Sequence, residues 1–146
     1  DHASRCVHWE INEGDSLTIV HDDPGTLIKA VRRIMEDLRD GPEQPVLRVA
    51  VDRGPVAVRR EGGRMRFLGR PLLRAARIEP HVPPDAIWAT GEFKESLEAS
   101  SSRYRAERIE PPEDRADPEG QGLLNIAKRA GTEPPSFVEV YRIDRA

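Results

Sequence analysis

Apolar and polar residues alternate along the chain in short blocks that predict strands and amphipathic helices. Residues 7–11 alternate between the two classes, and residues 17–20 are apolar again, with Gly14 and Asp15 in the turn between them. This pattern predicts a β-hairpin. Apolar residues then recur with helical spacing over 27–38, after a loop at 22–26 whose end we expect to cap the helix.

The rest of the chain continues this mixture of strands, helices and turns. We expect strands at 47–51, 56–58, 65–67, 87–90, 104–109, 123–128 and 137–143, and helices at 72–78 and 92–98. Residues 111–122, rich in Pro, Asp and Glu, predict a mobile acidic loop. Strand hairpins interleaved with helices predict an α+β fold, with helices packed on a mainly antiparallel sheet.

Composition narrows the class of protein. The 146 residues are enough for one domain, and 37% hydrophobic with 34% charged residues are typical of a globular chain. A single cysteine, Cys6, excludes a disulfide framework and is consistent with the cytoplasm. The net charge of −3 argues against a nucleic-acid-binding protein, and no apolar run predicts a membrane span.

Three positions are candidates for chemistry. Asp15 stands at a hairpin turn, where its carboxylate could bind a divalent cation, although Gly-Asp is also common in turns. Arg77 follows Gly69 on a predicted helix, and its planar guanidinium suits a phosphate oxyanion. The alternative is a helix arginine that extends its charged end to solvent or pairs with Glu79. Lys128, taken without its context, is an ordinary exposed strand lysine.

The order of these motifs resembles the catalytic domain of the class III nucleotidyl cyclases, from about residue 10 to residue 143. The resemblance is carried by the Gly-Asp turn, the amphipathic helix, a strand ending at Gly54 and Pro55, the segment from Gly69 to Arg77, and the final Val140 and Tyr141. It implies a ferredoxin-like sandwich and a head-to-tail homodimer with the active site between the two chains.

The resemblance also implies a reaction. The ribose 3′-hydroxyl of a nucleoside triphosphate attacks the α-phosphate and pyrophosphate leaves, giving a 3′,5′-cyclic nucleotide. It implies that Asp15 binds Mg²⁺ or Mn²⁺ in a two-metal site, that Arg77 stabilises the transition state, and that Lys128 holds the triphosphate tail. The family's other metal-binding aspartate lies on an earlier strand. Residues 1–146 lack that strand, so we expect either a fragment of a longer protein or an incomplete domain.

Three further positions depart from the purine-specific members of the family. Ile11, Arg66 and Leu73 stand where those enzymes have residues that recognise the base or position the ribose. The pattern resembles the bacterial pyrimidine cyclases of antiphage defence, which make cyclic UMP or cyclic CMP. Arg66 could donate to a pyrimidine carbonyl, and Trp9 or Phe67 could wall a small base, although both aromatics also suit a core.

Two functions therefore follow from the sequence. The first, which we favour, is a cytoplasmic cyclase for UTP or CTP. The alternative is a degenerate cyclase-like module that binds a nucleotide or mediates dimerisation only. Neither predicts a nucleic-acid or membrane partner.

Overall fold

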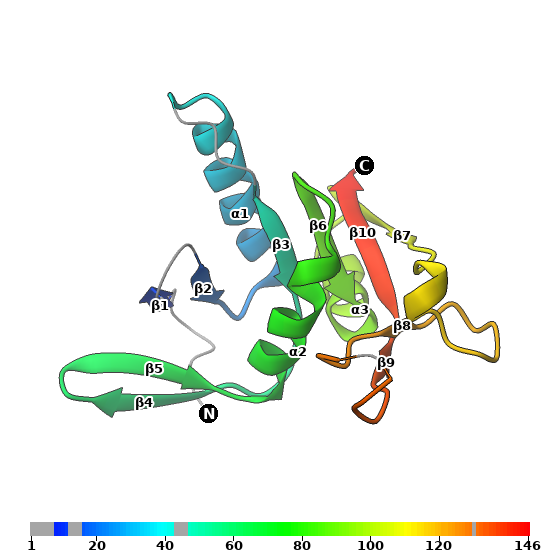
Figure 1. The fold of residues 1–146 in the computed structure, drawn as a ribbon. Coiled ribbons are helices and arrows are strands. Elements are labelled where there is room, and N and C mark those ends of the chain that lie inside the picture. Colours follow the sequence, from blue (N-terminus) through cyan, green and yellow to red (C-terminus); the bar gives the residue numbers. More distant parts are fainter. Residues whose placement is uncertain (1–7, 12–15, 43–46, 130) are drawn as a thin grey trace.

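A computed structural model describes the backbone of residues 8–11 and residues 16–42, 47–129 and 131–146 in full. The strands are β1 (His8–Ile11), β2 (Leu17–Val20), β3 (Arg48–Val51), β4 (Ala57–Glu61), β5 (Arg64–Leu68), β6 (Ala86–Thr90), β7 (Tyr104–Arg108), β8 (Leu124–Asn125), β9 (Phe137–Val138) and β10 (Val140–Arg145). The α-helices are α1 (Pro24–Arg39), α2 (Arg70–Ile78) and α3 (Gly91–Ser100), and η2 (Glu79–His81) and η3 (Glu113–Arg115) are 3-10 turns (Figure 1).

A four-stranded sheet in the order β3-β6-β10-β7 forms the centre of the molecule. β3 and β6 run parallel, with Val51 opposite Ala89, and the other two pairings are antiparallel. Three further antiparallel pairs, β1-β2, β4-β5 and β8-β9, surround it. The α+β class expected from the hairpins is confirmed, with the parallel pair as an addition that the alternation did not distinguish.

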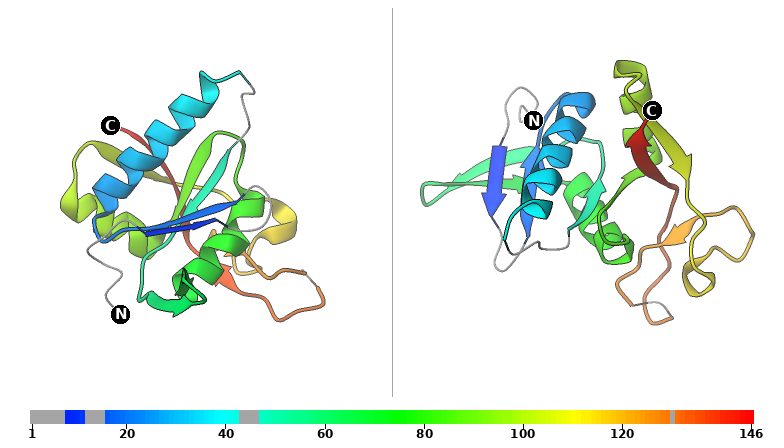
Figure 2. Two further views of the ribbon diagram at one scale, coloured as in Figure 1. Left: turned by 90° about the vertical axis from the view of Figure 1, so that its left-hand side faces the viewer. Right: turned by 90° about the horizontal axis from the view of Figure 1, so that it is seen from above.

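The two faces of the sheet bury different sets of side chains, as the alternation along a strand requires. On one face Ile87 and Ala89 of β6 pack with apolar residues of α1 and α3. On the other face Trp88 packs with Ile78, at the end of α2, and with Ile126, after β8. The sheet therefore lies between an α1/α3 layer and a layer built from α2 and the β8 segment (Figure 2).

Helix α1 begins earlier than the sequence pattern predicted. Asp23 is its N-cap, since its Oδ2 accepts a hydrogen bond of 2.9 Å from the backbone N–H of Thr26. Pro24 occupies the first helical position, where its fixed φ is compatible with the helix and its missing N–H costs no hydrogen bond. The expected loop at 22–26 is thus largely the cap and first turn.

The C-terminal region also differs from the expectation. The strand expected at 123–128 is only the two-residue β8, so Lys128 lies in the loop beyond it. The acidic segment, which we expected to be a mobile loop, contains local structure. It contains η3, and Asp117 accepts hydrogen bonds from the backbone of Gln121 (2.8 Å) and Leu123 (2.9 Å). These two bonds hold the pKa of Asp117 below its ordinary value.

A groove of about 1010 Å³ lies between β2 and β3. Its lining includes residues 17–20 and 47–51, with Val31 of α1 and Ala75 of α2. Among the described strands, β2 pairs with β1 alone and β3 with β6 alone, so no described strand joins them across this groove. None of the helices in the described ranges is both long and apolar enough to cross a bilayer.

Candidate functional site

Two glycines fix the start of α2 against the end of β3. A Cβ at Gly54, which has φ of 157°, would lie 2.7 Å from Cγ of Pro71. A Cβ at Gly69, with φ of 154°, would lie 2.6 Å from the carbonyl oxygen of Pro55. Both glycines are therefore required for conformation and for close approach. They bring the segment at Gly54 and Pro55 against the start of α2 at Gly69, although the β4-β5 hairpin separates the two in the sequence.

Arg77 is a half-buried cation at the far end of α2. The structure describes four half-buried arginines, and three of them donate hydrogen bonds to protein oxygens: Arg32 to Ile143, Arg74 to Asp52, and Arg115 to Ala127. The guanidinium of Arg77 makes no hydrogen bond or ion pair with any residue in the described ranges. The pairing with Glu79 considered from the sequence is not made in the structure.

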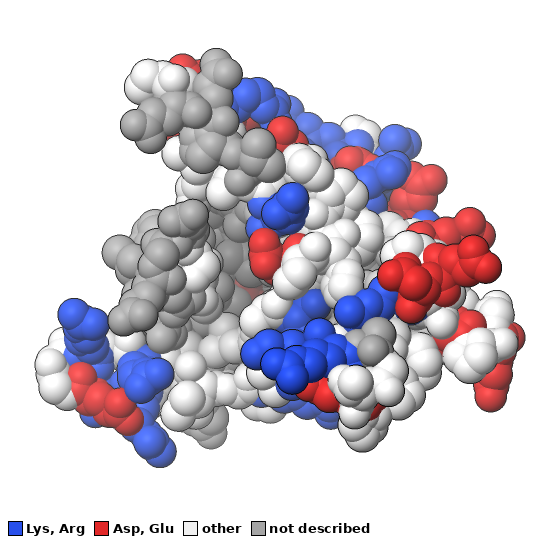
Figure 3. All heavy atoms as spheres, in the orientation of Figure 1, with Lys and Arg blue, Asp and Glu red and all other residues white. Residues whose placement is uncertain are grey.

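Lys128 lies in a segment that packs, like the end of α2, against the cluster around Trp88. Ile78, the next residue after Arg77, and Ile126, two residues before Lys128, are both buried in the cluster around Trp88. Lys128 is exposed, and its ammonium has no partner within the described part of the chain. Lys and Arg side chains gather over α2, which itself carries Arg70, Arg74 and Arg77, whereas acidic side chains gather toward 110–119 (Figure 3).

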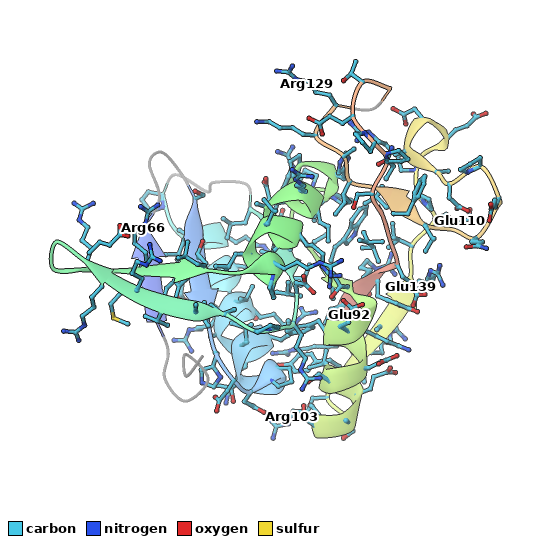
Figure 4. The ribbon with its side chains drawn as sticks, turned by 90° about the horizontal axis from the view of Figure 1, so that it is seen from below. Arg66, Glu92, Arg103, Glu110, Arg129 and Glu139 are labelled. Atoms are coloured by element: carbon cyan, nitrogen blue, oxygen red, sulfur yellow. The ribbon has the colours of Figure 1, made fainter. Side chains whose placement is uncertain are left out.

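Leu73 and Arg66 occupy different surroundings. Leu73 is 56% exposed and lies one turn before Arg77, so the two share a face of α2. Arg66, on β5, lies opposite Arg59, and both donate to Glu61 at 3.4 Å. Figure 4 shows Arg66 on the β4-β5 hairpin, well separated from Arg129 on the loop that contains Lys128. Phe67, in contrast, is buried in a cluster with Val20, which confirms its place in the core.

The remaining predicted positions lie in the first hairpin. Asp15 is outside the described residues. Ile11 is at the end of β1, opposite Leu17, and only its backbone is described, as for Trp9. The expected hairpin is confirmed on both sides of the turn. The residues that the structure describes contain no group of three or more His, Cys, Asp or Glu side chains suited to a metal ion, so they do not furnish a ligand set by themselves.

A buried carboxylate beneath α2 was not among the sequence candidates. Asp52 follows β3, its side chain is 1% exposed, and its two oxygens accept from Arg74 Nε and Nη2, each at 2.7 Å. Thr90, at the end of β6, donates to the same carboxylate at 2.6 Å. Glu92 also pairs with Arg74 at the surface. Hydrogen bonding to Asp52 is the main cause that raises the pKa of Arg74 above its ordinary value, so Arg74 stays charged.

His81 is the last residue of η2, the 3-10 turn that directly follows α2, and its pKa gives a pH-dependent prediction of stability. Its pKa is lowered from the ordinary 6.5 by burial and then by the charge of Arg115, while Asp114 opposes the shift. The unfolded chain then binds a proton more readily than the folded one. Stability should therefore be full above pH 6.5 and fall as the pH drops through the folded pKa.

Urea denaturation between pH 7.5 and 5 measures this effect. His81→Gln should flatten the part of the decline that belongs to His81. An unchanged pH slope in the variant would show that other groups cause the decline.

The sequence matches no protein family and no curated protein.

Proposed function

We propose that this chain is a class III nucleotidyl cyclase domain, converting a nucleoside triphosphate to a 3′,5′-cyclic nucleotide and pyrophosphate. UTP or CTP is the favoured substrate, and a signalling role in bacterial antiphage defence follows from that preference. The observation that carries the proposal is Arg77, a half-buried guanidinium without a described partner, on a helix whose position Gly54 and Gly69 determine. A half-buried guanidinium without a described ion-pair partner is suited to an anionic ligand.

The chemistry assigned to these side chains is binding and charge stabilisation. The 3′-hydroxyl oxygen forms a bond to the α-phosphorus, the bond to the bridging oxygen of the β-phosphate breaks, and the hydroxyl proton leaves to solvent. Arg77 donates to the α-phosphate oxygens as negative charge develops. Lys128 binds the triphosphate tail as a point charge. Mg²⁺ or Mn²⁺, with Asp15 as a ligand, would lower the pKa of the attacking hydroxyl.

The groove between β2 and β3 supports the same proposal. One added strand there would join the first hairpin to the central sheet, and both faces of that strand would contact apolar residues of the groove lining. In the proposed enzyme this strand carries the second metal-binding aspartate. Asp15 of one subunit would then face Arg77 of the other in a head-to-tail homodimer.

The preference for a pyrimidine depends on three positions. Leu73 presents an exposed apolar side chain beside Arg77, where an asparagine would hydrogen-bond the ribose in the resembling enzymes. Ile11 likewise has no hydrogen-bonding group. Among the described residues Arg66 has an exposed pair with Glu61, which contributes little energy and is easily exchanged for a base carbonyl.

The decisive experiment incubates the full-length protein with Mn²⁺ and each of ATP, GTP, CTP and UTP separately, and identifies cyclic products by mass spectrometry. Cyclic UMP or cyclic CMP supports the proposal in full. A purine product supports the reaction and contradicts the role given to Ile11, Arg66 and Leu73.

Absence of product in every reaction, with folded and dimeric protein, would instead favour the degenerate nucleotide-binding or dimerisation module.

Lys128→Ala should raise KM for the triphosphate. Lys29→Ala, which removes an exposed lysine from α1, is the matched control and should leave KM unchanged.

A further inference from the structure

Asp52 holds three separate elements of the fold together through one carboxylate. It follows β3, and its oxygens accept hydrogen bonds from Arg74 in α2 and from Thr90 at the end of β6. We propose that Asp52 is a positioning residue: by fixing Arg74, it sets the orientation of α2 and hence the direction in which Arg77 presents its guanidinium. This inference rests on the function proposed above.

The contact between Asp52 and Arg74 is a bidentate one. Nε donates to Oδ2 and Nη2 donates to Oδ1, both at 2.7 Å, and the two side chains are 1% and 18% exposed. Two parallel hydrogen bonds between planar groups fix the orientation of the guanidinium as well as its distance. A lysine at position 74 would keep the charge without this orientation.

Thr90 holds the Asp52 carboxylate from β6, in addition to the contact with Arg74. Its hydroxyl accepts from the backbone N–H of Phe93 at 3.3 Å, as the N-cap of α3, while it donates to Asp52 at 2.6 Å. The Thr90 side chain therefore cannot turn away without losing one of these bonds. Since Val51 is paired with Ala89, Asp52 and Thr90 are the next residues on two adjacent parallel strands. The groups that hold Arg74 in place, Asp52 and Thr90, therefore come from two neighbouring strands of the central sheet.

In the described part of the chain, few polar contacts fix the rotation of helix α2. It has nine residues and no side-chain hydrogen bond at its N-cap, which is Gly69. Pro71 and Ile78, near its two ends, are its buried residues, and Leu72 is partly buried against Phe67. Arg74 is the polar contact between these ends, and Arg77 lies three residues later on a neighbouring part of the helix surface. A turn of the helix about its axis would move Arg77 and break the pair with Asp52 together.

Asp52→Asn tests the proposal with little change in shape. We expect kcat for cyclic nucleotide formation to fall on the order of 100-fold, with KM nearly unchanged, because displacement of a group that acts in the transition state lowers kcat. Thr90→Val should lower kcat in the same direction, and Thr90→Ser, which keeps the hydroxyl, should retain it. Asp37→Asn, which removes an exposed carboxylate paired with Arg33, is the matched control.

Hydrogen exchange supplies a readout that does not depend on turnover. In Asp52→Asn the amides of α2 should exchange faster while those of α1 stay protected; if this variant fails to fold, Arg74→Lys and Thr90→Val give the same comparison. Wild-type kcat together with wild-type exchange in α2 would overturn the proposal, as would a lower melting temperature without any change in kcat. If the wild type forms no product, the proposed function fails, and the exchange comparison alone decides whether Asp52 orients α2.

Discussion

Replacing Arg77 with alanine is expected to lower kcat for cyclic nucleotide formation by about 10³- to 10⁵-fold, the range found for arginines that stabilise phosphoryl-transfer transition states. Thermal stability should change little. Arg77 has no partner in the described ranges, so its removal leaves no buried carboxylate or carbonyl unsatisfied. Rapid-quench assays with the preferred triphosphate, compared with thermal melts of the same preparations, measure both quantities.

The control for Arg77→Ala is the same substitution at an exposed arginine that has an ion-pair partner. Arg33 lies on α1, its side chain is 76% exposed, and its partner is Asp37. Arg33→Ala should retain full activity, because an exposed ion pair contributes at most about 1 kcal/mol to stability and Arg33 belongs to α1 rather than to α2. Arg77→Lys should recover only part of the rate, since an ammonium lacks the planar fork. Near-wild-type kcat in Arg77→Ala would contradict its assignment to the transition state.

Replacing Gly69 with alanine is expected to destabilise the whole domain. The methyl group would lie 2.6 Å from the carbonyl oxygen of Pro55, and the φ of 154° is unfavourable for any residue with a side chain. The backbone conformation costs about 1–3 kcal/mol, and the steric overlap costs about 1–3 kcal/mol more. Urea denaturation followed by circular dichroism should show this loss directly.

Gly120 separates the two contributions. Its φ of 72° is also positive, but a Cβ there would meet no atom within 4 Å. Gly120→Ala should therefore show the conformational cost alone and lose clearly less stability than Gly69→Ala. Equal losses in the two variants would show that the contact with Pro55 is relieved by a small shift of the backbone.

Local patterns in the sequence were sufficient to predict most of the elements. The hairpins around residues 12–16 and 62–63 were predicted because alternation and glycine-rich turns are short-range signals. The helix ending at Ile78 was predicted after the glycine turn at Gly69. The length of β8 was overestimated because Leu124 and Ile126 are buried by packing against Ile78 and Trp88 rather than by a long strand pairing.

The site was predictable only in part, for a physical reason. Arg77 and Lys128 were proposed from motifs, and the residues near them, Ile78 and Ile126, pack in one buried cluster. Asp52 was missed because its partners, Arg74 and Thr90, are distant in sequence and become neighbours only when β3 and β6 pair. The available signal was a carboxylate directly after an apolar strand, which by itself does not identify a partner.

The close contacts at Gly54 and Gly69 restrict which residues related sequences can have at these positions. Gly54 is confined partly by the ring of Pro71, and Gly69 by the carbonyl of Pro55, so each tight contact joins one motif to the other. Substitution of Pro71 by a smaller residue would relax the steric constraint on Gly54, whereas no side-chain substitution removes the carbonyl oxygen at position 55. Because the φ of 157° also disfavours a side chain at position 54, both glycines should stay invariant in a set of related chains, and Gly69 should do so whatever residue occupies position 55.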